Sequence, residues 1–297
     1  MHLVVIERLN TEVLPLRAVT PLNPLKKNMK KNKKTLLWKI SKKDKIGDSY
    51  VFGTMHVSDE RAFQYEEIVQ QKIRECDAFA LEFNLETAEM NVSGEAMNLP
   101  EGTTLESLIS PKKFAKISKR FTRTTGMDLR QFNQSIPMQI TNLMAAVILS
   151  QDRLKSLDET LFQYAKEQNK ILLGIESFEE QLEIMAKIPI KNQLKGMLDC
   201  FKSLKQFRKQ VLKMAKLYEQ SDLQQLYKSS KKSAGSERKL LLYDRNEIMA
   251  NRMDEMMQEQ TIVCAIGAAH LAGKKGVLRL LKLKGWKVKP VLIDDEV

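Results

Sequence analysis

Two of the three histidines in this 297-residue chain have a glycine three positions before them. Gly53 precedes His56 and Gly267 precedes His270, and each glycine follows an apolar run typical of a buried strand. Glycine allows a chain to turn sharply where a strand ends. Functional groups in open α/β sheets gather at the carboxyl ends of the strands. We therefore predict that both imidazoles are presented at one edge of a sheet.

Two carboxylates stand at comparable places. Glu82 lies within the apolar run 78–83, and Glu176 ends the run 171–176. A buried carboxylate is costly unless it is paired or bound to a cation. The structural alternatives are a buried salt bridge for Glu82 and, for Glu176, an orienting or capping role at the following helix.

These side chains together indicate a metal centre. Imidazole nitrogens and carboxylate oxygens suit Mn, Co, Fe or Zn, and such a metal lowers the pKa of a bound water and polarises a carbonyl. We predict that His56, Glu82 and His270 bind a divalent metal. The alternative is that the histidines act on water as bases, without a metal.

The elements that must position these residues alternate between strands and helices, which predicts the α/β class, with a central β-sheet flanked by helices. The predicted strands span 36–40, 50–52, 78–83, 171–176, 261–266 and 287–293. The predicted helices span 60–75, 104–130, 136–150, 158–168, 178–187, 193–228 with at most one break, 237–257 and 276–284, with a loop at 229–236. We expect one domain over 35–297, with halves of about 35–150 and 151–297. Residues 1–34, rich in proline and lysine, predict a disordered leader.

Composition is that of a globular protein, with 43% hydrophobic residues, but the net charge is +12. The excess is concentrated in three stretches, residues 26–45, 191–217 and 274–289. Aromatic residues make up only 6% and do not alternate with the basic ones as base-stacking platforms require. We therefore expect a solvated lysine-rich surface and no nucleic-acid partner. An adaptor for nucleic acid or another anionic surface is the least favoured of three functional hypotheses.

Nothing in the sequence predicts export. Cys76, Cys200 and Cys264 form an odd set without CxxC spacing, which favours reduced thiols. No apolar run approaches the roughly 20 residues of a membrane span, and the N-terminus lacks a signal-peptide pattern. We expect a cytoplasmic protein without membrane attachment. Whether Met1 or Met29 is the true start stays open.

Several short motifs occur in an order that resembles the TraB/PrgY/GumN family over about residues 36–293. They are the stretches 37–40, 50–57, 81–83, 157–158, 173–177, 180–181, 243–246 and 266–273, with Gly276 and Val277 beyond them. The resemblance implies two pseudo-related halves, each contributing a GxxH motif and a strand-end glutamate, in a fold related to ChaN-like haem proteins and erythromycin esterases.

The resemblance also implies roles for particular residues. It makes His56, Glu82, Glu176, Arg245 and His270 the catalytic set. Within this set, Arg245 would stabilise an oxyanion or grip a substrate carboxylate, although an arginine on a helix is more often solvated. Supporting roles fall to Gly53, Gly267, Asp158 and Asn246, of which Asp158 has the alternative of capping a helix.

The activity implied is less specific than the site. Eukaryotic members act as metal-dependent peptidases that prefer Mn or Co, whereas bacterial members are associated with pheromone shutdown. We therefore expect a hydrolase, a metal-dependent peptidase acting on a peptide or small-molecule substrate. The alternative is a non-catalytic protein that binds a peptide signal, a metal or, as the least favoured cofactor, haem. A homodimer is left open.

Overall fold

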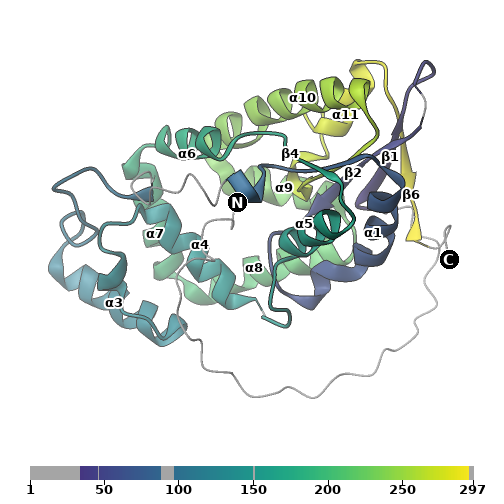
Figure 1. Cartoon of the computed structure of the whole chain (residues 1–297). Coiled ribbons are helices and arrows are strands. Elements are labelled where there is room, and N and C mark those ends of the chain that lie inside the picture. Colours follow the sequence, from purple (N-terminus) through teal and green to yellow (C-terminus); the bar gives the residue numbers. More distant parts are fainter. Residues whose placement is uncertain (1–33, 46, 88–96, 150, 294–297) are drawn as a thin grey trace.

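The computed structural model describes residues 34–45, 47–87, 97–149 and 151–293 (Figure 1). The predicted leader, residues 1–34, lies outside the described residues except for Lys34, and so do both candidate start positions.

A six-stranded sheet in the order β4-β3-β5-β2-β1-β6 forms the centre of the protein. The strands β2, β3, β4 and β5 are mutually parallel, and β1 pairs antiparallel with both β2 and β6. Their bounds are β1 Leu37–Ser41, β2 Ser49–Thr54, β3 Ala78–Leu81, β4 Ile171–Gly174, β5 Ile262–Gly267 and β6 Lys287–Val291. The predicted mixed α/β class, with a sheet flanked by helices, is confirmed.

Helices cover both faces of the sheet. Figure 1 shows α1 (Glu66–Glu75) and α5 (Leu157–Glu167) on one side and α10 (Arg245–Glu259) and α11 (Val277–Leu283) on the other. The chain steps from β2 to β3 and on to β4 in one direction, and then returns to β5, between β3 and β2. Right-handed crossovers place the connecting helices on opposite faces for opposite directions of travel, as observed.

The remaining helices extend the protein beyond the sheet. They are α3 (Pro111–Thr125), α4 (Pro137–Ile148), α6 (Phe178–Ala186), α7 (Ile190–Lys202), α8 (Leu204–Glu219) and α9 (Leu223–Ala234). Short turns of 3-10 helix are η1 (Glu60–Tyr65), η3 (Leu129–Phe132), η4 (Gly235–Glu237) and η6 (Ala268–His270), and η5 (Lys239–Asp244) is a π-helix. In Figure 1, α3, α4 and α7 lie at the left, away from β1 and β6.

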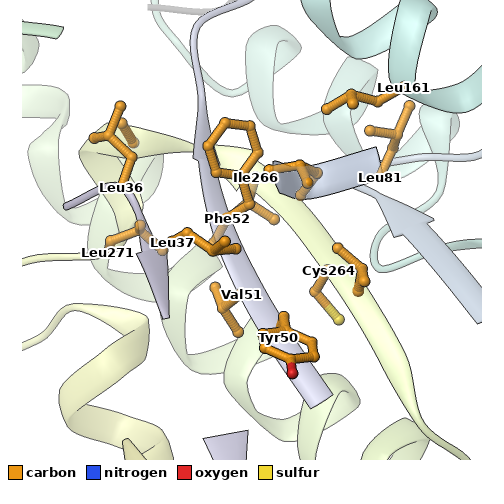
Figure 2. Close-up of a cluster of buried hydrophobic side chains, with 14 of the residues drawn as sticks. Leu36, Leu37, Tyr50, Val51, Phe52, Leu81, Leu161, Cys264, Ile266 and Leu271 are labelled. Carbon is orange, nitrogen blue, oxygen red and sulfur yellow. The ribbon is translucent and has the colours of Figure 1, made fainter. Parts of the chain in front are cut away.

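Two large hydrophobic clusters hold this arrangement together. The larger one surrounds the sheet, in which all six residues of β2 are buried, and Figure 2 shows part of it. The second cluster lies among α3, α4 and α7. Helix α4 joins them, because Met144 belongs to the second cluster and Ala145 and Ile148 belong to the first.

Several predicted elements were wrong in their bounds. Helix α3 begins only at Pro111, because Ser110 is held extended before the proline ring. The long helix 193–228 is broken twice, at Ser203, whose φ of −139° and ψ of 72° are not helical, and at Ser221, whose φ is 51°. The predicted loop 229–236 is largely the end of α9. None of the helices in the described part of the chain combines the length and the apolar character needed to cross a membrane.

Candidate functional site

The carboxyl ends of the four parallel strands bring the predicted residues together. His56 follows β2, Glu82 directly follows β3, Glu176 follows β4, and His270 follows β5 in η6. Backbone pairing continues beyond β3 and β4, since the Glu176 amide donates to the Glu82 carbonyl at 2.7 Å. The two glutamates therefore lie side by side. Glu82 lies just outside β3, although the sequence placed it inside a strand.

The two glycines serve close packing and do not need a left-handed backbone. Gly267 has a φ of −52°, and Gly53 is not among the glycines with positive φ. A Cβ on Gly53 would come within 2.8 Å of Leu271, and one on Gly267 would come within 3.2 Å of the Glu82 carboxylate. The expectation that glycine is needed for a sharp turn was therefore wrong. Glycine is needed here because neighbouring groups approach its α-carbon closely.

His56 is backed by a carboxylate. Its Nδ1 lies 2.9 Å from Asp158 Oδ1. Asp158 reaches the site because the amide of the residue before it, Leu157, donates to the Val57 carbonyl at 3.1 Å. The alternative role of Asp158 as a helix cap was wrong, since Ser156 caps α5 in a capping box with Glu159.

The same carboxylate controls the charge on His56. Burial opposes the imidazolium, but the attraction of Asp158, with help from Glu82, outweighs it and raises the pKa of His56 to about 10. The His56 side chain keeps 13% of its surface exposed, against 3% for His270. Solvent therefore reaches the site more easily on the His56 side.

His270 is backed by an amide. Its Nδ1 lies 2.6 Å from Asn246 Oδ1, and Asn246 Nδ2 donates to the Lys275 carbonyl at 2.7 Å. Because that donation fixes the amide oxygen toward the ring, Nδ1 of His270 carries the proton and Nε2 keeps a lone pair. Burial and the nearby charge of Arg245 lower the pKa of His270 to about 3.

Glu82 is the centre of the site. Its Oε1 lies 3.8 Å from Nε2 of His56 and 4.0 Å from Nε2 of His270, and it accepts a hydrogen bond of 2.8 Å from the Gly267 amide. Its Oε2 accepts from Arg245 Nη2 at 2.9 Å and from Gln181 at 3.2 Å. One oxygen of this carboxylate therefore faces both imidazoles, and hydrogen bonds to both of its oxygens hold the carboxylate in place.

Arg245 joins the two glutamates. Its Nε lies 3.0 and 3.1 Å from the Glu176 oxygens, and its Nη2 also donates to Glu176. The arginine is only 1% exposed, so the surface alternative for this residue was wrong. Burial opposes its charge, but Glu82 and Glu176 raise its pKa further above the ordinary range. Burial raises the pKa of Glu176, against the pull of Arg245.

A change of helix type delivers two successive residues to this site. The π-helix η5 runs directly into α10, whose first residues are Arg245 and Asn246. Arg245 faces the two glutamates and Asn246 faces His270. Short π-helical stretches are frequent at functional sites.

The chain matches a known protein family over most of its length. A model of the TraB/PrgY/gumN family matches residues 36–290. The chain belongs to this family. Neither the curated proteins nor the solved structures gave a match.

In this TraB/PrgY/gumN chain, sequence reasoning missed two buried contributors. Gln181 donates to Glu82 at 3.2 Å and to Glu176 at 3.3 Å, and Tyr218 donates to the Gly53 carbonyl at 2.8 Å. The Ser177–Glu180 capping box offered a signal for Gln181, because it marks the first turn of α6 directly after the strand-end glutamate. For Tyr218, the sequence offers only its place on the apolar stripe of a basic helix.

The residues of the TraB/PrgY/gumN site fit a divalent cation in chemistry and in charge. Three buried carboxylates, those of Glu82, Glu176 and Asp158, face a single permanent cation, Arg245. A divalent cation with neutral histidines would balance this excess. In the described residues, no group of three or more His, Cys, Asp or Glu side chains stands arranged to hold a metal ion. The separations of 3.8 and 4.0 Å exceed the about 3.4 Å between ligands of a tetrahedral metal.

Proposed function

We propose that the protein is a metal-dependent hydrolase that cleaves peptide bonds at the site of His56, Glu82 and His270. The observation that carries the proposal is the convergence of two imidazole Nε2 atoms on one buried carboxylate oxygen. Each Nδ1 is held from behind by a fixed oxygen, of Asp158 or of Asn246. Protein metal sites use such outer partners to orient ligating histidines.

The metal would be held by His56 Nε2, His270 Nε2 and Glu82 Oε1, with Mn, Co, Fe or Zn as candidates. When bound, it would supply an activated water and polarise the substrate carbonyl. Hydrolysis adds the water oxygen to the carbonyl carbon, breaks the carbon–nitrogen bond and leaves a proton on the departing amine. Each half of the chain would contribute one GxxH histidine and one strand-end glutamate, in keeping with the pseudo-related halves implied by the resemblance.

Arg245 is suited to stabilise the charge of the transition state. Its Nε and Nη2 are used by Glu82 and Glu176, whereas Nη1 is buried without a hydrogen-bond partner among the described residues. That remaining donor can stabilise negative charge that develops on the carbonyl oxygen. Because Glu176 binds Arg245 through both carboxylate oxygens, we assign it a positioning role.

The first test is metal content by elemental analysis. Wild type, His270→Ala and His2→Ala are purified side by side without chelator, and His2→Ala is the matched control because His2 is the third histidine of the chain. We expect close to one metal per chain in wild type and in the control, and a loss in His270→Ala. Equal metal content in all three proteins, or none in wild type after reconstitution, would contradict the proposed centre.

The second test is turnover. The metal-loaded protein is incubated with a mixture of unrelated peptides, and the products are identified by mass spectrometry. We expect cleavage by wild type and none by His56→Ala, with folding checked by circular dichroism. If peptides bind but are recovered intact after long incubation, the result would contradict the hydrolase and favour a binding protein.

A further inference from the structure

Three helices together carry as much net charge as the whole chain. Helices α3, α7 and α8 hold fourteen basic residues and two acidic ones, Asp199 and Glu219, which leaves +12. The entire protein has a formal net charge of +12. The basic stretch 191–217 of the sequence covers most of α7 and α8, but none of the three basic stretches includes α3. The concentration of positive charge on these three helices is therefore evident only from the structure.

The basic side chains occupy the outward faces of these helices. In α3 the buried stripe is Phe114, Ile117 and Phe121, and in α8 it is Val211, Ala215 and Tyr218. Thirteen of the fourteen basic residues are exposed, and the other, Arg120, is half-buried. The thirteen are Lys112, Lys113, Lys116, Lys119, Arg123, Lys191, Lys195, Lys202, Lys205, Arg208, Lys209, Lys213 and Lys216.

The three helices meet, so their charges add over one region. Arg120 of α3 donates to the Phe201 carbonyl near the end of α7, and the Phe121 and Phe201 rings lie 6.4 Å apart. Only Ser203 separates α7 from α8. Beside this junction, a hollow of about 490 Å³ on α8 is lined by Lys205, Arg208 and Lys209 among others.

We propose that these faces of α3, α7 and α8, the basic surface, bind the phosphate backbone of duplex nucleic acid without reading its sequence. A duplex presents one negative charge per about 1.7 Å along its axis, which suits lysines spread over several helices. The low content of aromatic residues, which do not alternate with the basic ones, argued against base stacking, but contacts to the backbone of a duplex need no stacking.

The composition of the surface favours a duplex over a membrane or a protein. The large hydrophobic side chains that are exposed in the described residues lie outside these three helices, at Val147, Leu154, Ile171, Ile248 and Leu283. Membrane-surface helices insert apolar side chains into the lipid, and stable protein interfaces have an apolar centre. The basic surface exposes no large apolar side chain, so it suits a partner that is bound through its phosphate groups alone.

The test is fluorescence anisotropy with the full chain and a labelled random-sequence DNA duplex of about 20 base pairs. The surface variant is Lys116→Glu, Lys119→Glu, Lys205→Glu and Lys209→Glu combined. The control variant is Lys274→Glu, Lys282→Glu, Lys287→Glu and Lys289→Glu, which changes the net charge equally on other exposed lysines. If the surface variant unfolds, the corresponding Lys→Gln variant replaces it.

We expect wild type to bind the duplex. The logarithm of its association constant should fall linearly with the logarithm of the salt concentration, with a slope of about 0.9 per phosphate neutralised. The surface variant should lose at least about tenfold in affinity and show a shallower slope, whereas the control should change less than about threefold. Equal losses in both variants, no binding at low salt, or tighter binding to phosphatidylserine vesicles or to polyglutamate than to the duplex would each overturn the proposal.

Discussion

The two histidines come from the same motif on neighbouring parallel strands, yet they differ in charge. His56 is backed by a carboxylate, which raises its pKa to about 10, and keeps some exposure. His270 is backed by an amide and lies deeper, and its pKa is lowered to about 3. Both Nε2 atoms face the same glutamate oxygen. The difference shows that the surroundings of each ring, and not the motif, set its charge, because Asp158 favours the imidazolium of His56 whereas burial and Arg245 disfavour that of His270.

The largest effect is expected when Arg245, which holds the glutamate that both histidines face, is replaced. Arg245→Met leaves Glu82 and Glu176 as buried carboxylates without their cation, which should cost about 3–5 kcal/mol of unfolding free energy. Urea denaturation measures this cost. The matched control is Arg252→Met on the same helix, where the half-exposed pair with Glu180 should contribute at most about 1 kcal/mol. Equal losses for the two variants would show that the buried network adds nothing.

The second prediction exchanges the atoms behind the rings. Asp158→Asn should lower the pKa of His56 from about 10, and Asn246→Asp should raise that of His270 from about 3, each by about 1–3 pH units. Imidazole carbon NMR of chelator-treated protein measures both, because the chain has only three histidines. Unchanged titration in both variants would mean that the rings are controlled by something other than their Nδ1 partners.

The Asp158→Asn variant also has a pH signature in stability. The folded pKa of His56 lies above its ordinary 6.5, so its pairing stabilises the protein fully below about pH 6.5. That contribution is lost as the pH rises toward about 10. The metal-free variant should therefore lose less stability than wild type between about pH 7 and about pH 10, as measured by urea denaturation.

The third prediction affects the His56 side alone. Tyr218→Phe removes the hydrogen bond to the Gly53 carbonyl and should cost about 0.5–1.5 kcal/mol. It should also shift the NMR signal of His56 and leave that of His270 unchanged. Tyr65→Phe, which removes a buried hydroxyl contact with Ser221, is the control with a similar cost and no shift at His56. Equal shifts at both histidines would contradict the assignment.

The smallest expected effect concerns the first turn of α6, the helix that follows β4. Glu180 pairs with Arg252, and its pKa is lowered from 4.5 to about 2. The pair stabilises the protein above about pH 4.5 and is lost as the pH falls toward 2. Because both side chains are more than one-third exposed, Glu180→Gln should cost less than about 1 kcal/mol at neutral pH. Glu183→Gln, in an exposed pair on α6, should cost nothing measurable, and neither variant should change either histidine.

Features that depend on local pattern could be predicted from the sequence. The apolar runs before Gly53 and Gly267 marked strands, and parallel strands end at one edge, so both histidines were placed correctly. Helix ends were harder to predict. Ser203 separates α7 from α8 and Ser221 separates α8 from α9, and both lie between residues that favour a helix. Ser221, whose φ is 51°, has a hydroxyl contact of 2.8 Å with Tyr65, a residue 156 positions earlier in the chain.

Pairings between distant parts of the chain could not be predicted in this way. Asp158 and His56 are joined by the contact of the start of α5 with the loop after β2, and Gln181 reaches Glu82 across 99 positions of sequence. No local rule gives such partners. The family resemblance implied supporting roles for Asp158 and Asn246, but only the fold shows which imidazole each one contacts.

The position of β5 also has a consequence for how the protein is made. This strand, Ile262–Gly267, lies between β2 and β3, which are both formed from the first third of the chain. During synthesis, β2 can pair with β1 and β3 with β4, but the edges of β2 and β3 that β5 joins must wait for a segment made about 180 residues after β3. Until then their apolar edges are open to pairing with other chains. A chain truncated before residue 262 should accumulate in aggregates, even though it contains His56 and both site glutamates.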